Sequence, residues 1–438
     1  MSNRIRYQWR DLLIRVRGGG FLANVLVLAG GTGLSQLVLI LASPFLTRLY
    51  SPSEFGVLAV FSSTLGLLAV VATLRYEFAI PLPESTASAI NLLAANGLVL
   101  VGTSVLTGIM VFFFGDDLVT LLSIPELAPF LWLLPVGMFA AGGVQSLTYW
   151  FVRQRQFKRL TQARVGQSLT IAGGQLFMGW QQMGSIGLVG GNISGRIVAD
   201  IILFVDLVRE DRDLFKHIRL SDIKRAAWRY RRFPLISSWS GLLNQSGLQL
   251  PTLLFASFFG VQAAGWYGLA QRIAGIPITL IAYSVSQVYF GEASRLRNEN
   301  PKEMRRLFLR IASKLLLFVG APLVIGGLTA PWLFGFVFGE KWRISGWYIV
   351  ALLPMFLGQI VVRPLSQSLN ILERQDLQLY WDIGRLIAII GAIGLSHFVF
   401  HLEMMGTLAL YSLSMLVMYL IYFVVMFIQI TKFNPISE

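Results

Sequence analysis

The chain has 438 residues, and 55% of them are hydrophobic while only 13% are charged. Soluble globular domains contain about 45–50% apolar and about 25% charged residues, so this composition excludes an ordinary soluble protein. The absence of cysteine excludes disulfides, thiolate metal sites and thiol nucleophiles. The net charge is +14, and what it indicates depends on where the Lys and Arg residues lie.

The first 19 residues precede the apolar part of the chain. Ile5, Trp9 and Leu12 follow helical spacing, with arginines interleaved. This pattern suits either a helix lying on an anionic leaflet or a basic tail that only sets topology. Beyond it, apolar windows of about 20 residues predict twelve transmembrane helices. They lie at 20–47, 55–81, 87–114, 127–152, 160–181, 184–208, 233–258, 263–291, 308–335, 345–371, 376–396 and 405–430.

The linkers between these helices are mostly short, so consecutive helices should be antiparallel. The linker at 209–232 is longer and rich in charged residues, and it divides the predicted helices into two sets of six. We therefore predict an all-α polytopic membrane protein with a basic amphipathic cytoplasmic segment at 1–19 and an N-lobe at 20–208. A cytoplasmic linker with a surface helix follows at 209–232, and a C-lobe at 233–438.

The positive charge marks one side of the membrane. Of the 36 Lys and Arg residues, 27 lie in the termini and the linkers on one side, and three in the linkers on the other. The positive-inside rule assigns the first side to the cytoplasm, with both termini inside. The basic charge is therefore a topology signal, and we expect no nucleic-acid partner.

Short matches recur in the two halves. Gly56 and Gly265, 209 residues apart, open the second and eighth predicted helices. Leu134-Pro135 recurs as Leu353-Pro354, 219 residues apart. Their shared order favours two parallel six-helix repeats, an architecture typical of transporters with a site near the membrane midplane.

Five arginines lie away from the ends of the predicted helices: Arg75, Arg196, Arg272, Arg363 and Arg385. Each costs about 2.5–3.5 kcal/mol at the centre of a spanning helix, so we expect them to face the protein interior. With Lys314, six basic residues face four acids within the predicted helices. This excess predicts a cationic cavity, which suits an anionic cargo such as a pyrophosphate or an acidic glycan.

Two of these arginines have acids on their own helix. Arg196 and Asp200 are spaced i, i+4, and Asp382 and Arg385 are spaced i, i+3, so both pairs can neutralise themselves.

The other three differ in their surroundings. Arg75 and Glu77 are two residues apart and should point in different directions on one helix. Arg272 and Arg363 have no acid within reach on their helices. They are the best candidates for an unpaired positive charge in a cavity. Amide side chains add hydrogen-bonding groups for sugar hydroxyls or for helix contacts: Gln36, Asn91, Asn96, Gln145, Gln175, Gln245, Gln249, Gln287 and Gln359.

Catalytic motifs are lacking. The sequence contains no GxxxxGK[ST] loop, no HExxH motif and no GxSxG elbow. Asp211-Arg212-Asp213 has the DxD pattern of glycosyltransferases but lies in the charge-dense linker, where a solvated loop is expected. His397 and His401 have a metal-ligand spacing in a short external linker, where polar interface residues are expected. We therefore predict no enzyme activity and no metal site.

Two stretches in each half resemble signatures of one family. In the first half they are Thr47–Gly56 (TRLYSPSEFG) and Leu74–Ile80 (LRYEFAI). In the second half they are Phe338–Trp342 (FGEKW) and Leu372–Gln375 (LERQ) with Trp381-Asp382. The chain thus resembles Wzx-type O-antigen and exopolysaccharide flippases, the polysaccharide transport branch of the multidrug/oligosaccharidyl-lipid/polysaccharide exporter superfamily.

The resemblance implies two six-helix lobes, V-shaped around a central cavity, in the bacterial inner membrane. It implies that an undecaprenyl-pyrophosphate-linked oligosaccharide moves from the cytoplasmic to the periplasmic leaflet by alternating access. The lipid bilayer and the polysaccharide polymerase machinery are the expected partners. No cofactor is expected besides a proton or sodium gradient, and the sequence does not choose between the two ions.

The candidate substrate-binding residues are Arg48, Arg75, Arg272, Arg363 and Arg385. Glu77 and Asp382 are the candidates for ion coupling or ion pairing. Only Arg48, Arg75 and Glu77 lie in matched motifs, and the others depend on the charge argument.

Two alternatives stay open. A cation-coupled drug exporter of the same superfamily would favour acids and aromatic residues in an N-lobe pocket, where this chain also places Arg75 and Arg196. A membrane glycan polymerase or ligase would need a large periplasmic loop, and the external linkers here are short.

Overall fold

The computed structural model describes residues 21–433, apart from the side chains of residues 21–29 and Asn298. The predicted amphipathic segment at 1–19 lies outside these residues and stays a prediction. Within the described part, the secondary structure is helical and contains no strand. The chain divides into two units, each described by itself.

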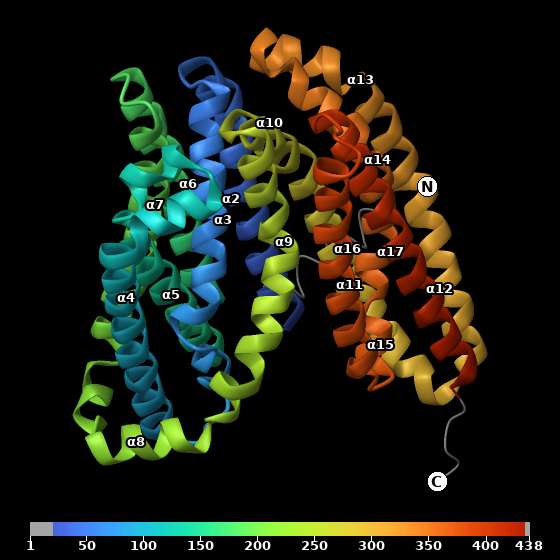
Figure 1. The fold of residues 1–438 in the computed structure, drawn as a ribbon. Coiled ribbons are helices and arrows are strands. Elements are labelled where there is room, and N and C mark those ends of the chain that lie inside the picture. Colours follow the sequence, from blue (N-terminus) through green and yellow to red (C-terminus); the bar gives the residue numbers. More distant parts are fainter. Residues whose placement is uncertain (1–20, 434–438) are drawn as a thin grey trace, which may run out of the picture. The chain divides into compact units, whose positions relative to one another are not determined.

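The first unit contains residues 21–49, 65–118 and 128–239. Its helices are α2 (Phe21–Leu49), the second half of α3 (Pro52–Ala72), most of α4 (Thr86–Leu122), α5 (Leu133–Arg153), α6 (Phe157–Trp180), α7 (Ser185–Glu210) and α8 (Leu220–Arg229). Helix α6 packs closely on α7 because Gly191 and Gly195 face the side chains of Gln175 and Ile171. Figure 1 shows α8 lying across one end of α4.

The second unit contains residues 50–64, 119–127 and 240–433. It holds the first half of α3, α9 (Ser238–Phe259), α10 (Val261–Ala270), α11 (Ile276–Glu299), α12 (Pro301–Leu315), α13 (Ala321–Phe338), α14 (Arg343–Leu365), α15 (Gln367–Ile371), α16 (Gln375–Phe398) and α17 (Met404–Lys432). Single π-helical turns at 271–275 and 316–320 join α10 to α11 and α12 to α13. Helix α14 is largely buried and packs on α11, α13 and α17.

The twelve predicted spans correspond to long helical segments in the described chain. These are α2, α3, α4, α5, α6, α7, α9, α10–α11, α12–α13, α14, α16 and α17. Nine segments are long and apolar enough to cross a membrane by length and composition. The other three, α5, α6 and α9, have 21, 24 and 22 residues and carry more polar side chains. The all-α polytopic fold class is confirmed.

One predicted helix end was wrong. Helix α3 ends at Ala72, whereas the apolar pattern continued to residue 81. The helix stops because Leu74 and Arg75 adopt left-handed backbone conformations, with φ of 48° and 64°. A short 3-10 helix, η1 (Tyr76–Ala79), follows this turn.

The two repeat glycines meet in the second unit. A Cβ on Gly56 of α3 would overlap the backbone carbonyl of Val261, at the start of α10. A Cβ on Gly265 of α10 would overlap the carbonyl of Pro52, at the start of α3. Equivalent positions of the repeat therefore lie at one close helix crossing, and each backbone occupies the space that a side chain would need on the other.

Candidate substrate and coupling site

Glu77 is a fully buried carboxylate in the first unit, beyond the end of spanning helix α3. It accepts hydrogen bonds from the Thr73 hydroxyl at 2.5 Å and from Nε2 of Gln145, on α5, at 2.9 Å. Burial raises the pKa of Glu77, and the Thr73 hydrogen bond and the nearby Arg75 charge only partly oppose this rise. A buried carboxyl group of this kind takes up a proton at higher pH than an exposed one.

Arg75 lies beside this carboxylate. Its Nη1 is 3.9 Å from Oε1 of Glu77, and its guanidinium carbon lies 5.0 Å from the centre of the Phe78 ring. The expectation that Arg75 and Glu77 point in different directions was wrong, because the left-handed turn replaces the helix on which it relied. The buried Nε of Arg75 has no hydrogen-bond partner among the described residues.

A second buried acid lies in the same unit. Asp200 of α7 faces Gly143 of α5, where its Oδ1 would lie 2.6 Å from an added Cβ. Arg196 donates instead to Oδ1 of Asn192 at 3.2 Å, and no Arg196–Asp200 ion pair is formed in the described structure. The predicted pair is absent because the long arginine side chain extends towards the helix N-terminus, one turn away from Asp200.

Arg385 and Asp382 form the predicted pair in the second unit. Nη2 of Arg385 lies 3.2 Å from Oδ1 of Asp382, and both side chains are largely buried. The same nitrogen donates to the carbonyl and side-chain oxygens of Asn244, at 3.2 and 3.1 Å. The guanidinium also packs on Gly247 of α9 and over the ring of Trp381. Arg385 therefore connects α16 to α9 with its charge compensated.

Arg272 has no such partner. It lies half-buried in the π-helical turn between α10 and α11. Its side chain forms no hydrogen bond or ion pair with any residue that the structure describes. Single π-turns of this kind are frequent at functional sites because they alter the direction of neighbouring side chains.

Arg363 has only neutral partners. Its Nη1 donates to the Thr279 hydroxyl of α11 at 3.2 Å. With the Gln359 amide oxygen turned towards it, that oxygen accepts from Nη2 and Nε at 2.6 and 3.0 Å. Thr279 follows Arg272 by seven residues, about 10 Å along a helix. Two arginines without a described carboxylate partner thus flank one stretch of α11.

Arg48 is exposed in the last turn of α2, and its side chain forms no hydrogen bond or ion pair with a described residue. The rest of its motif is mainly structural. Ser51 and Glu54 form a capping box at the start of α3, with Glu54 accepting from the Ser51 N–H at 2.6 Å. Lys341 donates to the Tyr50 carbonyl at 2.8 Å, so the first-half and second-half signatures meet in one unit.

Several of the predicted polar amides connect helices. Asn96 donates to the Ser146 hydroxyl and Gln175 to the Leu188 carbonyl. Asn91 donates to the His217 carbonyl. These amides are occupied by protein partners, whereas Gln145 and Gln359 contact the charged residues described above. The sequence named Asp200 only as the partner of Arg196, whereas its buried Oδ1 has no hydrogen-bond partner among the described residues.

The solved structures of two transporters share the fold. One is an inward-facing multidrug resistance MATE family transporter of the MOP superfamily, with a TM-score of 0.73 and 15% identity over 92% of this chain and 96% of that one. The other is the lipid II flippase MurJ in an inward closed conformation, with a TM-score of 0.68 and 13% identity over 94% and 88%. The protein therefore has the polytopic fold of these membrane transporters.

The sequence also matches a family described as polysaccharide biosynthesis protein, over residues 45–345. The chain belongs to this family, which confirms the family resemblance of its motifs. The succinoglycan biosynthesis transport protein ExoT of Rhizobium meliloti is 24% identical over 80% of this chain and 69% of that protein. The lipopolysaccharide biosynthesis protein WzxC of Escherichia coli is 22% identical over 86% and 74%.

A third relative matches a shorter region. The teichuronic acid biosynthesis protein TuaB of Bacillus subtilis is 33% identical over 149 residues, which are 34% of this chain and 30% of that protein. Family and fold together confirm the prediction of a multi-pass membrane transport protein rather than an enzyme.

Proposed function

We propose that the protein is a flippase for an undecaprenyl-pyrophosphate-linked oligosaccharide, which it moves from the cytoplasmic to the periplasmic leaflet of the bacterial inner membrane. The observation that carries the proposal is the pair Arg272 and Arg363, which lack a carboxylate partner in the described structure. A buried cation without a counter-ion is costly in a membrane, at about 2.5–3.5 kcal/mol for each residue at the centre of a helix. A transported pyrophosphate would supply the missing negative charge.

We assign Arg75 and Arg48 weaker contributions to binding of the transported anion. Arg75 shares its charge with Glu77 and still has an unpartnered Nε, so it can contact an anion in part. Arg48 is exposed and free to contact substrate. Arg385, with its charge compensated by Asp382, is assigned to helix packing in this proposal.

Alternating access would be driven by an ion gradient. We assign Glu77 as the protonatable group, because it is buried and its pKa is raised. Protonation removes its attraction for Arg75 and leaves that arginine free to contact the anion. The polysaccharide polymerase machinery is the expected recipient of the transported unit.

The test is translocation of a lipid-pyrophosphate-linked oligosaccharide in proteoliposomes. Arg272→Gln and Arg363→Gln should each reduce the rate at least about tenfold, the effect expected for one lost charge-assisted contact. Arg306→Gln is the matched control, because this arginine is exposed on α12 and paired with Glu303. It should transport at the wild-type rate.

Loss in both variants with intact folding supports the proposal. Transport at the wild-type rate in both would leave the arginines with structural roles. A folded wild type that moves no lipid-linked glycan but exports cationic drugs would replace the proposal with the drug-export alternative.

A further inference from the structure

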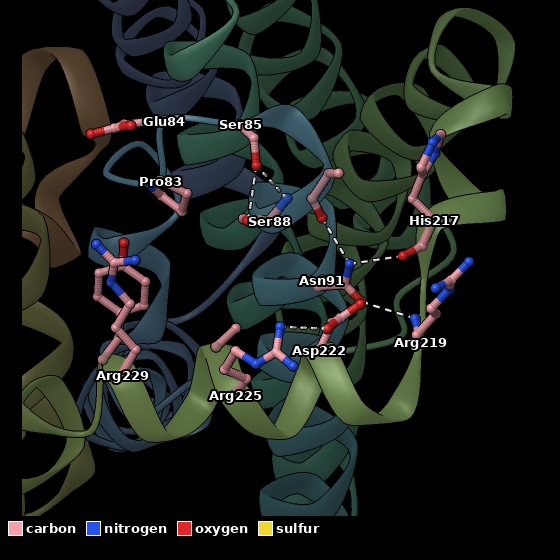
Figure 2. A pocket seen from close by; sticks show the side chains of 13 residues that line it. Pro83, Glu84, Ser85, Ser88, Asn91, His217, Arg219, Asp222, Arg225 and Arg229 are labelled. Atoms are coloured by element: carbon pink, nitrogen blue, oxygen red, sulfur yellow. Dashed lines mark hydrogen bonds and ion pairs between the residues drawn. The ribbon is translucent and has the colours of Figure 1, made fainter.

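A cavity of about 540 Å³ lies in the first unit, apart from the buried charges described above. Its wall is formed by the 83–85 segment, the start of α4, residues 217 and 219, and α8. Figure 2 shows the side chains that line it. This volume is within the range of about 300–1,000 Å³ that is typical of small-molecule sites.

Arginine side chains dominate the charge of this cavity. The ionised lining residues are Arg219, Arg225, Arg229, Glu84 and Asp222. Asp222 pairs with Arg225 at 3.1 Å, whereas Arg229 forms no ion pair with any acid in the described chain. Figure 2 shows Arg229 rising from α8, Arg225 turned towards Asp222, and Arg219 pointing away. Arg229 is therefore the cation available to a ligand.

Neutral donors lie on the opposite wall. The hydroxyls of Ser85 and Ser88 are 2.9 Å apart, and both residues line the cavity. Helix α4 begins at Thr86 and carries no acid in its first turn, and the Ser85 hydroxyl caps it by accepting from the Ser88 N–H at 3.2 Å. Hydroxyls and arginines beside a helix N-terminus are the groups with which proteins bind phosphate.

The position of α8 identifies where such a ligand would come from. The helix lies in the connection between α7 and α9, and nine residues separate it in sequence from the end of the spanning helix α7. Its Leu220 and Trp228 are exposed by 66% and 71%, and Lys224 lies between them in sequence. An amphipathic helix with exposed aromatic and basic residues next to span ends is typical of the lipid headgroup region.

We propose that this cavity binds a phosphate-bearing anion, held by Arg229 of α8 and by the hydroxyls of Ser85 and Ser88. The phosphate would come from a phospholipid headgroup or from a soluble phosphate compound, because both present the same oxygens. The site goes beyond the proposed transport function and is tested by binding.

Two hydrogen bonds connect the cavity wall to the Glu77 turn and to α4. Tyr76 directly precedes Glu77, and its hydroxyl donates to the Ala227 carbonyl of α8 at 3.0 Å. The Arg219 N–H donates to Oδ1 of Asn91, on α4, at 3.0 Å. Occupancy of the cavity would hold α8 against both elements and so stabilise the turn that carries Glu77.

The experiment uses the full-length protein in nanodiscs and hydrogen–deuterium exchange of residues 83–91 and 215–230. One arm adds inorganic pyrophosphate to nanodiscs of phosphatidylcholine. The other replaces part of that lipid with phosphatidylglycerol. Arg229→Gln should weaken the protection by about tenfold in apparent affinity, since one charge-assisted contact is lost. Lys224→Gln removes the same charge from the same helix but from outside the cavity lining, and should leave the affinity unchanged.

Protection in the first arm identifies a soluble phosphate as ligand, and protection confined to the second identifies a lipid headgroup. Either result supports the site when Arg229→Gln alone weakens it. Equal weakening by both substitutions would show general attraction of a basic helix to anions and overturn the proposal. Absence of protection in both arms would overturn it as well.

Discussion

At the scale of single residues, the proposed function depends on which charges within the helices are compensated. Arg385 has a carboxylate and two amide-group oxygens around it, whereas Arg272 has no described partner and Arg363 has only neutral ones. The sequence predicted this difference from the spacing of acids along each helix. It was wrong for Arg196, whose side chain bonds to Asn192 rather than to Asp200.

Glu77→Gln should flatten the pH dependence of stability. Because the folded protein raises the pKa of Glu77 above the ordinary value of 4.5, the folded state binds a proton that the unfolded chain has already lost. The Glu77 contribution is therefore fully present below that ordinary value and is lost as pH rises through the folded pKa. Tm measured by thermal shift from acidic to neutral pH should fall less in the variant, and an unchanged slope would contradict the assignment.

Breaking the Arg385–Asp382 pair should destabilise the second unit. Removal of one partner leaves a buried charge without compensation, at a cost of about 3–5 kcal/mol. Asp382→Ala should therefore lower Tm strongly, and Arg385→Met combined with Asp382→Leu should lower it much less. Thermal unfolding followed by light scattering and circular dichroism checks this. Similar loss in the single and double variants would show that Arg385 is needed for its bonds to Asn244 instead.

At the scale of elements, α3 and α10 cross closely at the two glycines that the repeat had matched. The glycines allow the helix backbones to touch, so the crossing tolerates no side chain at either position. The left-handed turn after α3 brings Glu77 beside Arg75, and Tyr76, which follows this turn, bonds to α8.

Gly56→Ala and Gly265→Ala should each destabilise the protein by about 1–3 kcal/mol, because the added methyl group overlaps a backbone carbonyl. Gly97→Ala is the matched control, since nothing lies within 4 Å of a Cβ at that helical position. Its Tm should equal or exceed that of the wild type. Comparable losses in all three variants would mean that the effect does not come from the crossing, since alanine favours a helix more than glycine does.

At the scale of the whole molecule, the distribution of Lys and Arg predicts that the 209–232 connection is cytoplasmic and that the connection containing Glu126 is periplasmic. The chain has no native cysteine, so single cysteines can report on each side. Asp213→Cys, at an exposed position, should react with an impermeant maleimide only in inverted vesicles. Glu126→Cys, also exposed, should react only in right-side-out vesicles. The reverse pattern would invert the topology and with it the direction of transport.

The sequence by itself determined the class of the protein. The number and order of the long helices were predicted from the length of the apolar stretches, and their orientation from the linkers in which Lys and Arg lie. These are local properties of the chain. The signature motifs indicated the family for the same reason, since each is a continuous stretch of residues.

Only the tertiary structure decided which partners from other helices each charge meets and which segments line a cavity. Asn244 and Arg385, or Asn91 and the segment before α8, are far apart in the sequence and meet through packing. The left-handed backbone at Leu74 and Arg75 was also not visible in the apolar pattern, and the Glu77 and Tyr76 side chains that follow it bond to α5 and α8. The hydrophobic pattern of the sequence predicts each helix separately, whereas a site is formed by residues from several helices.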